Sequence, residues 1–424
     1  MFIILYFSID YSIMKFRYNE LENATQFIAI SETKEETYGL RAQGPYAPIR
    51  LVNNILTIHY VSKKKLHPDV IGAICITAFY PFIKHSATMP FPVSQQFADG
   101  LKMDILPQHD KINGVYKATQ CISITNIDKT INPYNNAENT VIAYGGGMDS
   151  TAIALMFPEY PLVHSSNIND KVEVKNVMKK YINENLSNDS YVIDSNCKQL
   201  CKPGGFTCFT NIFLIPLLLT ADLNIRNICC GETLTASCLR TGQKYFPQFN
   251  PNRRNRWLRF YNHIGIHMFS PIAGCSELIT AKIVYSHSLS NKVLFCETNK
   301  GKPCYNCSKC LRKLLELNHH GYNYDFNTFH KGTAIKILKK RPLYDNLYFI
   351  ETIKNSKTLP NYMKECIKDI IHIRTDLFHK IYSKSFIYFP DAIKTKLLSK
   401  LYNYAEIMND EEEKYIEAWD MTVI

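Results

Sequence analysis

The sequence predicts an α/β fold in which a doubly wound parallel sheet is preceded by an α+β domain and followed by a helical extension. The main observation is an alternation between residues 138 and 324, where short apolar runs typical of buried strands take turns with segments of helical periodicity. Outside that stretch the alternation stops. Residues 14–137 mix strand and helix patterns, and residues 325–424 are mostly helical. We therefore expect three domains: 14–137, 138–324 and 325–424.

Length and composition agree with a large folded protein. The chain has 424 residues, and 46% of them are hydrophobic, which is enough for more than one core. Its formal net charge of +11 fits an anionic partner such as a nucleotide or RNA. The same charge also fits a lysine-rich chain that binds no nucleic acid.

The N-terminal segment and the cysteines indicate a reducing compartment. The first apolar run is short, lacks a basic start and is not followed by a small-residue cleavage pattern, so we expect no signal peptide. Met14 is a better beginning than Met1, and residues 1–13 are interpreted as an upstream extension. No apolar run reaches about 18 residues, so no membrane span is expected. Fourteen cysteines without a secretory signal favour a cytoplasmic protein whose clustered thiols bind metal or lie in the core.

The first domain shows no catalytic pattern, and we expect it to support the fold or to gate a substrate. Residues 49–62 are strand-like on both sides of Asn53-Asn54, which predicts a hairpin. His67-Pro68-Asp69 then opens an apolar helix, with proline at a favoured starting position. A second short helix is predicted over residues 92–102.

The central domain is predicted to alternate strands and helices. Strands are expected in the segments TVIAY, YPLVHSS, YVIDS and IRNICCGET. Helices are expected in DSTAIALMF, which Pro158 ends, in VEVKNVMKKYINEN, and in FTNIFLIPLLLTADL, which Pro216 is expected to kink. Ligands of such sheets bind at the carboxyl ends of the strands, where the segment GGGMDS also lies.

A glycine run joins the first of these strands to its helix. Backbone N–H groups of Gly145, Gly146 and Gly147 can converge on an anion there, and the helix N-terminus adds attraction. Asp149 suits a Mg²⁺ ion between phosphates, and the Ser150 hydroxyl can donate to a phosphate oxygen. The pattern is neither G-x-x-x-x-G-K-[ST] nor G-x-G-x-x-G. The alternative interpretation is a glycine turn without a ligand.

A cysteine group lies near the end of the central domain. The spacing C-x7-C-x2-C-x2-C places four thiols within one short segment, as a tetrahedral structural Zn²⁺ site requires. Buried free cysteines and an iron–sulfur cluster are the alternatives. The residues are Cys296, Cys304, Cys307 and Cys310.

The two motifs resemble those of a known enzyme superfamily. Residues 146–150 match the S-G-G-x-D-S loop of the PP-loop ATP pyrophosphatases, with Gly145 in the place of the family's serine. The cysteine spacing and the segment SPIAGCSELITAKIV, residues 270–284, resemble 7-cyano-7-deazaguanine synthase within that superfamily. This resemblance covers about residues 138–315, so residues 1–137 and 325–424 have no counterpart in the small synthase.

The resemblance implies an AMP-forming ligase that uses ATP, Mg²⁺ and Zn²⁺. It implies adenylation of a carboxylate such as a 7-deazaguanine acid, for amidation and nitrile formation or for ligation. Asp149 and Ser150 would be catalytic. The nucleotide-binding residues would be Gly145, Gly146, Gly147, Met148, Asp149, Ser150, Ser165 and Gly231. The base-recognition residues have no match here, so the substrate does not carry over.

Other functions stay open at this point. A PP-loop RNA-modifying enzyme would use the basic C-terminal helices to hold RNA, and a catalytically impaired nucleotide-binding protein would explain Gly145. Glu232 is a further candidate contact for substrate or metal. The expected partners are ATP and a small-molecule carboxylate, with no membrane. A homodimer, a nucleic acid or a protein acceptor remains open.

Overall fold

The computed structural model describes most of the chain. The residues described are 13–31, 50–83, 86–105, 123–135, 137–170, 172–202, 212–239, 242, 244–245, 253–289, 293, 302–322, 324–340, 348–386, 389 and 391–421. In this part of the chain every helix is too short or too polar to cross a membrane.

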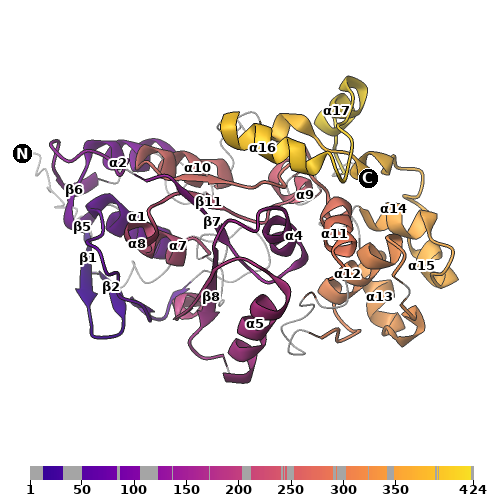
Figure 1. Ribbon diagram of the computed structural model, residues 1–424, viewed down its shortest axis with the longest axis horizontal. Coiled ribbons are helices and arrows are strands. Elements are labelled where there is room, and N and C mark those ends of the chain that lie inside the picture. The colour runs from indigo at the N-terminus through magenta and orange to yellow at the C-terminus, as the bar shows by residue number, and fades with distance from the viewer. Residues whose placement is uncertain are drawn as a thin grey trace, which may run out of the picture.

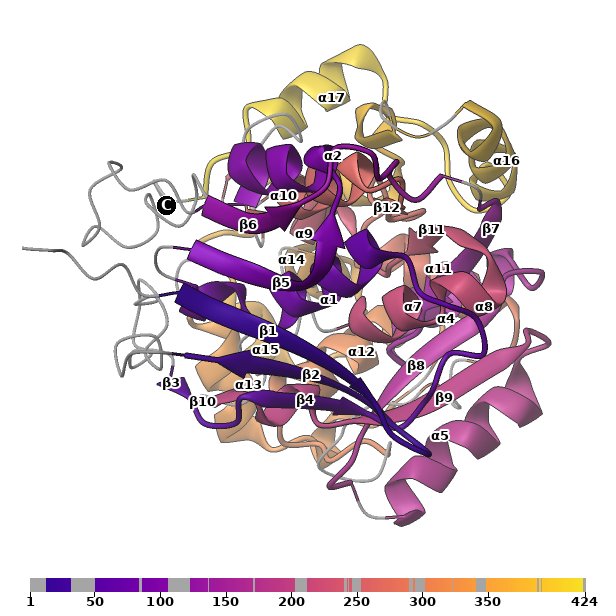
Figure 2. The same cartoon turned by 90° about the vertical axis from the view of Figure 1, so that its left-hand side faces the viewer.

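The strands form a ten-stranded sheet and a two-stranded sheet. Their bounds are β1 Ile13–Glu20, β2 Thr25–Ile30, β3 Arg50–Leu51, β4 Ile55–Ile58, β5 Ser86–Val93, β6 Ser123–Ile127, β7 Asn139–Ala143, β8 Leu162–Asn167, β9 Ser190–Ser195, β10 Cys201–Lys202, β11 Ile225–Cys229 and β12 His267–Phe269. The large sheet has the order β12-β11-β7-β8-β9-β4-β2-β1-β5-β6 (Figure 2). The fold is therefore mixed α/β around one large sheet.

Along the chain, the helices lie between and after these strands (Figure 1). Their bounds are α1 Pro68–Phe79, α2 Gln95–Gly100, α4 Met148–Met156, α5 Val172–Asn185, α7 Leu214–Leu218, α8 Thr220–Leu223, α9 Leu234–Ser237, α10 Arg253–His263, α11 Glu277–Ser286, α12 Ser308–His319, α13 Lys331–Leu338, α14 Tyr348–Asn355, α15 Asn361–Cys366, α16 Asp391–Leu401 and α17 Asp410–Glu417.

The large sheet has two differently built halves. From β12 to β9 all neighbouring strands are parallel. β4 then pairs antiparallel with β9 through Ile58 and Ser195, and β2 and β1 continue antiparallel before β5 and β6 add parallel strands. The sheet thus runs without interruption from residues of the first expected domain into those of the second.

Two hydrophobic cores cover the two faces of the parallel part of this sheet, from β12 to β8. Alternate residues of β7 enter different cores: Ile142 belongs to one, and Val141 and Ala143 belong to the other. This is the two-residue periodicity of a strand that is buried on both faces. One core includes side chains of α1, α7 and α10, whereas the other includes α4, α11, α12 and the C-terminal helices. Figure 1 shows α4 next to α11 and α12.

Most of the predicted elements are confirmed. α1 begins at Pro68, α2 lies within residues 92–102, and α5 has the bounds of the predicted helix. β7, β8, β9 and β11 occupy the four predicted strand segments of the central region. Residues 325–421 are mostly helical in their described part. Short-range patterns were sufficient here because each element has its own periodicity and its own boundary residue.

Two local predictions were wrong. Asn53-Asn54 does not make a hairpin, because β3 pairs with β10 whereas β4 pairs with β2 and β9. The helix expected around Pro216 is also not kinked at that residue. It is divided at Leu219 into α7 and α8, and Pro216 lies in the first turn of α7, where an α-helix does not need the missing N–H.

Candidate functional site

The glycine loop, residues 145–147, joins β7 to α4 at the carboxyl end of the parallel half of the sheet. Gly146 has φ of 74°, a left-handed conformation that glycine adopts without strain. Gly147 is the N-cap of α4 with φ of −85° and ψ of 176°, and no side chain caps the helix there. Its carbonyl accepts a 3.3 Å hydrogen bond from Ser150 Oγ. The first-turn N–H groups of α4 therefore have no side-chain acceptor at this N-cap.

Space around the loop differs from one glycine to the next. A Cβ at Gly147 would meet no atom within 4 Å, and one at Gly145 would meet only Ser150 Oγ at 3.9 Å. A Cβ at Gly231, after β11, would lie 3.0 Å from Ser150 N. Gly231 thus permits close approach of the β11 end to the first turn of α4. The side of the loop at Gly147 stays open, as a phosphate cradle requires.

Helix α11 connects two loops at this edge of the sheet. Thr280 Oγ1 donates a 2.8 Å hydrogen bond to Asp149 Oδ1 in the first turn of α4. One turn earlier, Glu277 accepts hydrogen bonds from Thr233 Oγ1 at 2.9 Å and Thr235 Oγ1 at 2.8 Å. Both threonines follow β11. The orientation of Asp149 is therefore fixed by the helix that also binds the loop after β11.

Charged side chains of α12 interact electrostatically with Asp149 and Glu277. Together they form the buried cluster, which consists of Asp149, Glu277, Arg312, Lys313 and Glu316. Burial, together with the charge of Asp149, raises the pKa of Glu277 to about 7. Burial also raises the pKa of Glu316 to about 7, even though Arg312 opposes the shift. Burial lowers the pKa of Lys313 to about 8, with Arg312 acting in the same direction. Carboxyl groups with these pKa values exchange protons near neutral pH.

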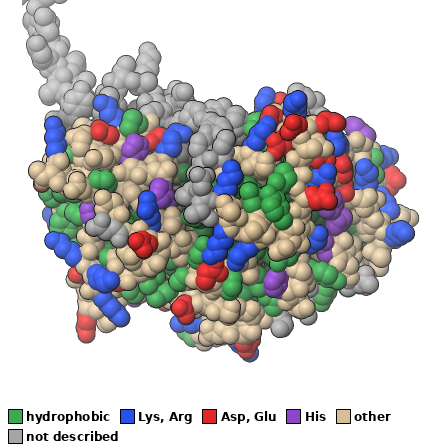
Figure 3. Space-filling view, turned by 45° about the horizontal axis from the view of Figure 1, so that its top comes forward, with side chains coloured by type: hydrophobic (Ala, Val, Ile, Leu, Met, Phe, Trp, Pro, Cys, Tyr) green, Lys and Arg blue, Asp and Glu red, His purple; other side chains and the backbone are tan. Residues whose placement is uncertain are grey.

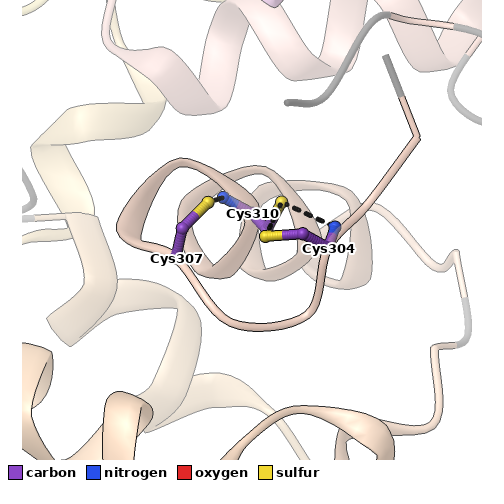
Figure 4. A group of neighbouring side chains, drawn as sticks. All are labelled: Cys304, Cys307 and Cys310. Atoms are coloured by element: carbon purple, nitrogen blue, oxygen red, sulfur yellow. Dashed lines mark hydrogen bonds between the residues drawn. The ribbon is translucent and has the colours of Figure 1, made fainter. Parts of the chain in front are cut away.

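The cysteine turn, residues 304–310, leads into α12 (Figure 4). The Sγ atoms of Cys304, Cys307 and Cys310 all lie within 4.8 Å of one another, and those of Cys304 and Cys310 are 3.6 Å apart. Two sulfurs on one tetrahedral Zn²⁺ are separated by about 3.8 Å, given Zn–S bonds of about 2.3 Å. Tyr305 adopts a left-handed φ of 53° and turns the chain between the thiols. The three thiols therefore fit a metal ion, and Cys296 lies outside the described residues.

Three further predicted site residues have clear surroundings. Met148 is 2% exposed and packs in the core, so only its backbone is available to a ligand at the glycine loop. Ser165 lies within β8, where its Oγ is 3.0 Å from Ser195 Oγ on β9. The backbone N–H of Glu232 donates to Ser270 Oγ at 3.0 Å, and its carbonyl accepts from the same hydroxyl. These contacts hold the ends of neighbouring strands together.

Several basic residues outside the cluster form ion pairs with acids. Arg259 Nε lies 2.6 Å from Asp104 Oδ1, and Lys396 Nζ lies 2.6 Å from Glu159 Oε1. Lys384 contacts Glu417 in the C-terminal region. The face with α16 and α17 carries acidic and basic side chains intermixed (Figure 3). This intermixing weakens the case for a C-terminal surface that holds RNA.

The C-terminal part of the chain is similar to a known protein family. Residues 256–420 match a family of unknown function (DUF6395). No curated protein matches the chain. The matched segment includes α11, α12 and the cysteine turn, whereas the glycine loop lies before it.

The sequence patterns did not identify Thr280, Glu277 or Arg312 as members of the site. Thr280 is separated from Asp149 by 131 positions, so no local spacing connects them. A signal was nevertheless present in α12. Arg312 and Glu316 interrupt the apolar run of Leu311, Leu314 and Leu315, and charges on the buried face of a helix are uncommon without a partner or a function.

Proposed function

We propose that this protein binds ATP at the glycine loop and transfers AMP to a carboxylate substrate, with release of pyrophosphate. The observation that carries the proposal is the open loop between β7 and α4, which ends in an uncapped helix N-terminus and is followed at once by Asp149. Backbone N–H groups at such an N-terminus bind phosphate oxygens. On this proposal the parallel half of the sheet is a doubly wound PP-loop domain, and the helices on both of its faces support that assignment.

Each residue of the loop has a distinct proposed role. The N–H groups of the first turn of α4 and of residues 145–147 hold phosphate oxygens, and the Ser150 hydroxyl can turn from Gly147 O to a phosphate. Asp149 would hold Mg²⁺, which would neutralise charge on the phosphates. Thr280 already orients one carboxylate oxygen of Asp149 and leaves the other for the ion.

The cysteine turn has a structural role in this proposal. Cys307 is the N-cap of α12 and accepts a hydrogen bond from Cys310 N, so the thiols and the helix start are a single unit. A Zn²⁺ ion held by Cys304, Cys307 and Cys310, with Cys296 as the fourth ligand, would fix this end of α12. Because α12 also carries Arg312 and Glu316, the metal would position charges beside Asp149 without taking part in the chemistry.

The proposed acceptor is a 7-deazaguanine acid, and the support for it is the resemblance of the two motifs to 7-cyano-7-deazaguanine synthase. Purified protein would be incubated with ATP, Mg²⁺, 7-carboxy-7-deazaguanine and ammonia. We expect AMP and pyrophosphate in equal amounts, together with a mass change of the acid. ADP and orthophosphate as the products would contradict adenylation. AMP formation with other carboxylic acids alone would preserve the reaction class and replace the substrate.

A further inference from the structure

Arg312 is an unusual member of the buried cluster because one of its buried N–H groups has no acceptor among the described residues. Its Nε is buried and has no hydrogen-bond partner in the described part of the chain. In that part of the chain Arg312 forms an ion pair with Glu316. The distance between Arg312 Nε and Glu316 Oε1 is 3.6 Å, which is too long for a hydrogen bond of good geometry. A guanidinium offers five N–H donors in a fixed fork, and leaving a buried donor unsatisfied is costly. The arrangement is therefore incomplete without another acceptor.

Two neighbouring groups have the same property. Glu316 Oε1 and the Tyr348 hydroxyl are buried and make no hydrogen bond of normal geometry, although each influences the pKa of the other. Tyr348 is 1% exposed, whereas the side chain of Arg312 is 28% exposed. Arg312 thus extends from a dry interior toward accessible space. Unsatisfied groups of this kind in one cluster point to a ligand rather than to a completed structural ion pair.

The position of Arg312 connects it with the glycine loop. The groups that interact electrostatically with its guanidinium are Tyr348, Glu316, Asp149 and Glu277. Asp149 is in the first turn of α4, and α11 packs against both α4 and α12. Because an arginine guanidinium is always charged near neutral pH, a positive charge lies beside the proposed phosphate site.

The chemistry of the cluster selects the class of ligand. A planar guanidinium pairs in a bidentate manner with carboxylate or phosphate oxygens. The described carboxylates do not form a group of three that could hold a metal ion. In addition, burial raises the pKa of Glu277 and Glu316 to about 7, which reduces the negative charge that an incoming anion meets near neutral pH.

We propose that Arg312 is an oxyanion-binding residue that faces the glycine loop and completes its hydrogen bonds on a ligand. The oxyanion is either the phosphate end of ATP, later pyrophosphate, or the carboxylate of the acceptor. This inference rests on the proposed function, because it takes the glycine loop to be the nucleotide site. It adds a recognition residue that the glycine loop itself does not contain.

Calorimetric titration of wild type, Arg312→Lys and a control, Arg374→Lys, tests the inference. Arg374 has a similarly exposed side chain, at 35%, and pairs with Glu411 and Glu412. The probes are pyrophosphate with Mg²⁺, 7-carboxy-7-deazaguanine, and AMP. Arg312→Lys keeps the charge but loses the fork, so affinity for one oxyanion probe should fall about tenfold or more while AMP binding is unchanged. Arg374→Lys should bind all three like wild type.

The pattern of losses separates the two sources of the oxyanion. Weaker pyrophosphate binding assigns Arg312 to the nucleotide, and weaker binding of the acid assigns it to the acceptor. Unchanged binding of both probes overturns the inference while leaving the proposed function intact. A wild-type protein that binds none of the three overturns both.

A second measurement does not depend on the folding of a variant. Phenylglyoxal modifies accessible arginines, and peptide mass spectrometry would follow Arg312 and Arg374 in the wild-type protein. Pyrophosphate with Mg²⁺, or the acid, should protect Arg312 but not Arg374. Equal modification of Arg312 with and without both probes would also overturn the inference.

Discussion

The glycine loop and the cysteine turn each open a helix, but they do so by opposite means. At the loop, Gly147 precedes α4 without a capping side chain, and the space beside it is open. At the turn, Cys307 caps α12, and the sulfurs of Cys304 and Cys310 are 3.6 Å apart. The first helix start leaves donors available, whereas the second is closed by its own side chains.

This difference indicates different relations to a ligand. An open backbone cradle suits a ligand that enters and leaves, and a closed thiol group suits an ion that stays and stabilises the fold. The two regions meet at α11 and α12, where Thr280 binds Asp149 and where Arg312 and Glu316 lie. Changes at the cysteine turn should therefore affect stability first, and changes at the loop should affect turnover first.

The largest effect is expected from Cys307→Ser. This change removes a thiol that caps α12 and lies in the metal-binding group, so metal content should fall and unfolding should become easier by about 4 kcal/mol or more. Elemental analysis and denaturant unfolding measure the two quantities. The control is Cys75→Ser, which changes a buried thiol of α1 in the other core.

The control variant should lose some stability but keep its metal content. Absence of metal from freshly reduced wild-type protein would rule out the metal site. Equal metal content in wild type and Cys307→Ser would remove this cysteine from the ligand set.

The second-largest effect is expected in the pH dependence of stability, when Glu277 is changed. Glu277 lies on α11, which connects the two regions. Its pKa is raised from 4.5 to about 7, mainly by burial, so the native state binds more protons than the unfolded state between these values. Stability contributed by this group therefore falls as pH rises from about 4.5 to about 7, by about 3 kcal/mol in all. Glu277→Gln should remove that part of the slope in urea unfolding measured at pH 5 and pH 7.5.

Glu351 on α14 is a control with the opposite sign. Burial acts to raise its pKa, but hydrogen bonds from His379 and Thr375 outweigh burial and lower it. The stability that this group contributes is therefore present above about pH 4.5 and is lost as the pH falls below that value. Glu351→Gln should consequently cost nearly the same stability at pH 5 and at pH 7.5, and less at lower pH. If the cost of Glu277→Gln is equally insensitive to pH between 5 and 7.5, the buried carboxyl of Glu277 does not have the environment described here.

Asp149→Asn should separate chemistry from stability. The amide keeps an acceptor for Thr280 Oγ1, so unfolding should change little, whereas loss of a carboxylate ligand should lower Mg²⁺-dependent turnover about a hundredfold or more. Steady-state AMP formation at several Mg²⁺ concentrations provides the test. Turnover within a factor of two of wild type would show that Asp149 does not hold the ion.

The smallest effect is expected from Gly145→Ser. The added Cβ would meet only Ser150 Oγ, at 3.9 Å, so a serine fits at this position. Its hydroxyl would restore the first residue of the S-G-G-x-D-S pattern of the PP-loop ATP pyrophosphatases. One neutral hydrogen bond contributes about 1 kcal/mol, so ATP binding should tighten several-fold at most. Much weaker binding would mean that this position must approach the ligand through its backbone alone.

Whether a feature could be predicted from the sequence depended on how far apart its residues lie along the chain. The glycine loop, the Pro68 helix start and the cysteine spacing are each contained within a few residues, and their patterns were readable. Asp149 and Thr280 meet across 131 positions, and Lys400 reaches Met156 O at the end of α4 across 244. Such contacts depend on how α11 and α16 pack, which local periodicity does not encode.

The hairpin expected at Asn53-Asn54 illustrates the same limit. The turn signal was present, but β4 pairs with β2 and β9, and β3 pairs with β10. Pairing with distant strands outweighed the local turn preference. The charged residues of the buried cluster could likewise be identified in the sequence, but the sequence did not show that they lie close together in the fold.

The central claim is that the glycine loop binds the phosphates of ATP. The most direct measurement is calorimetric titration of MgATP into wild type, Gly147→Val, Ser150→Ala and Gly145→Ser. A valine at Gly147 meets no protein atom within 4 Å of its Cβ, so it should fold normally and fill the phosphate space. We expect ATP affinity to fall about tenfold or more for Gly147→Val and less for Ser150→Ala. Unchanged affinity in all three variants would contradict the account, because a loop that holds phosphate cannot be indifferent to all of them.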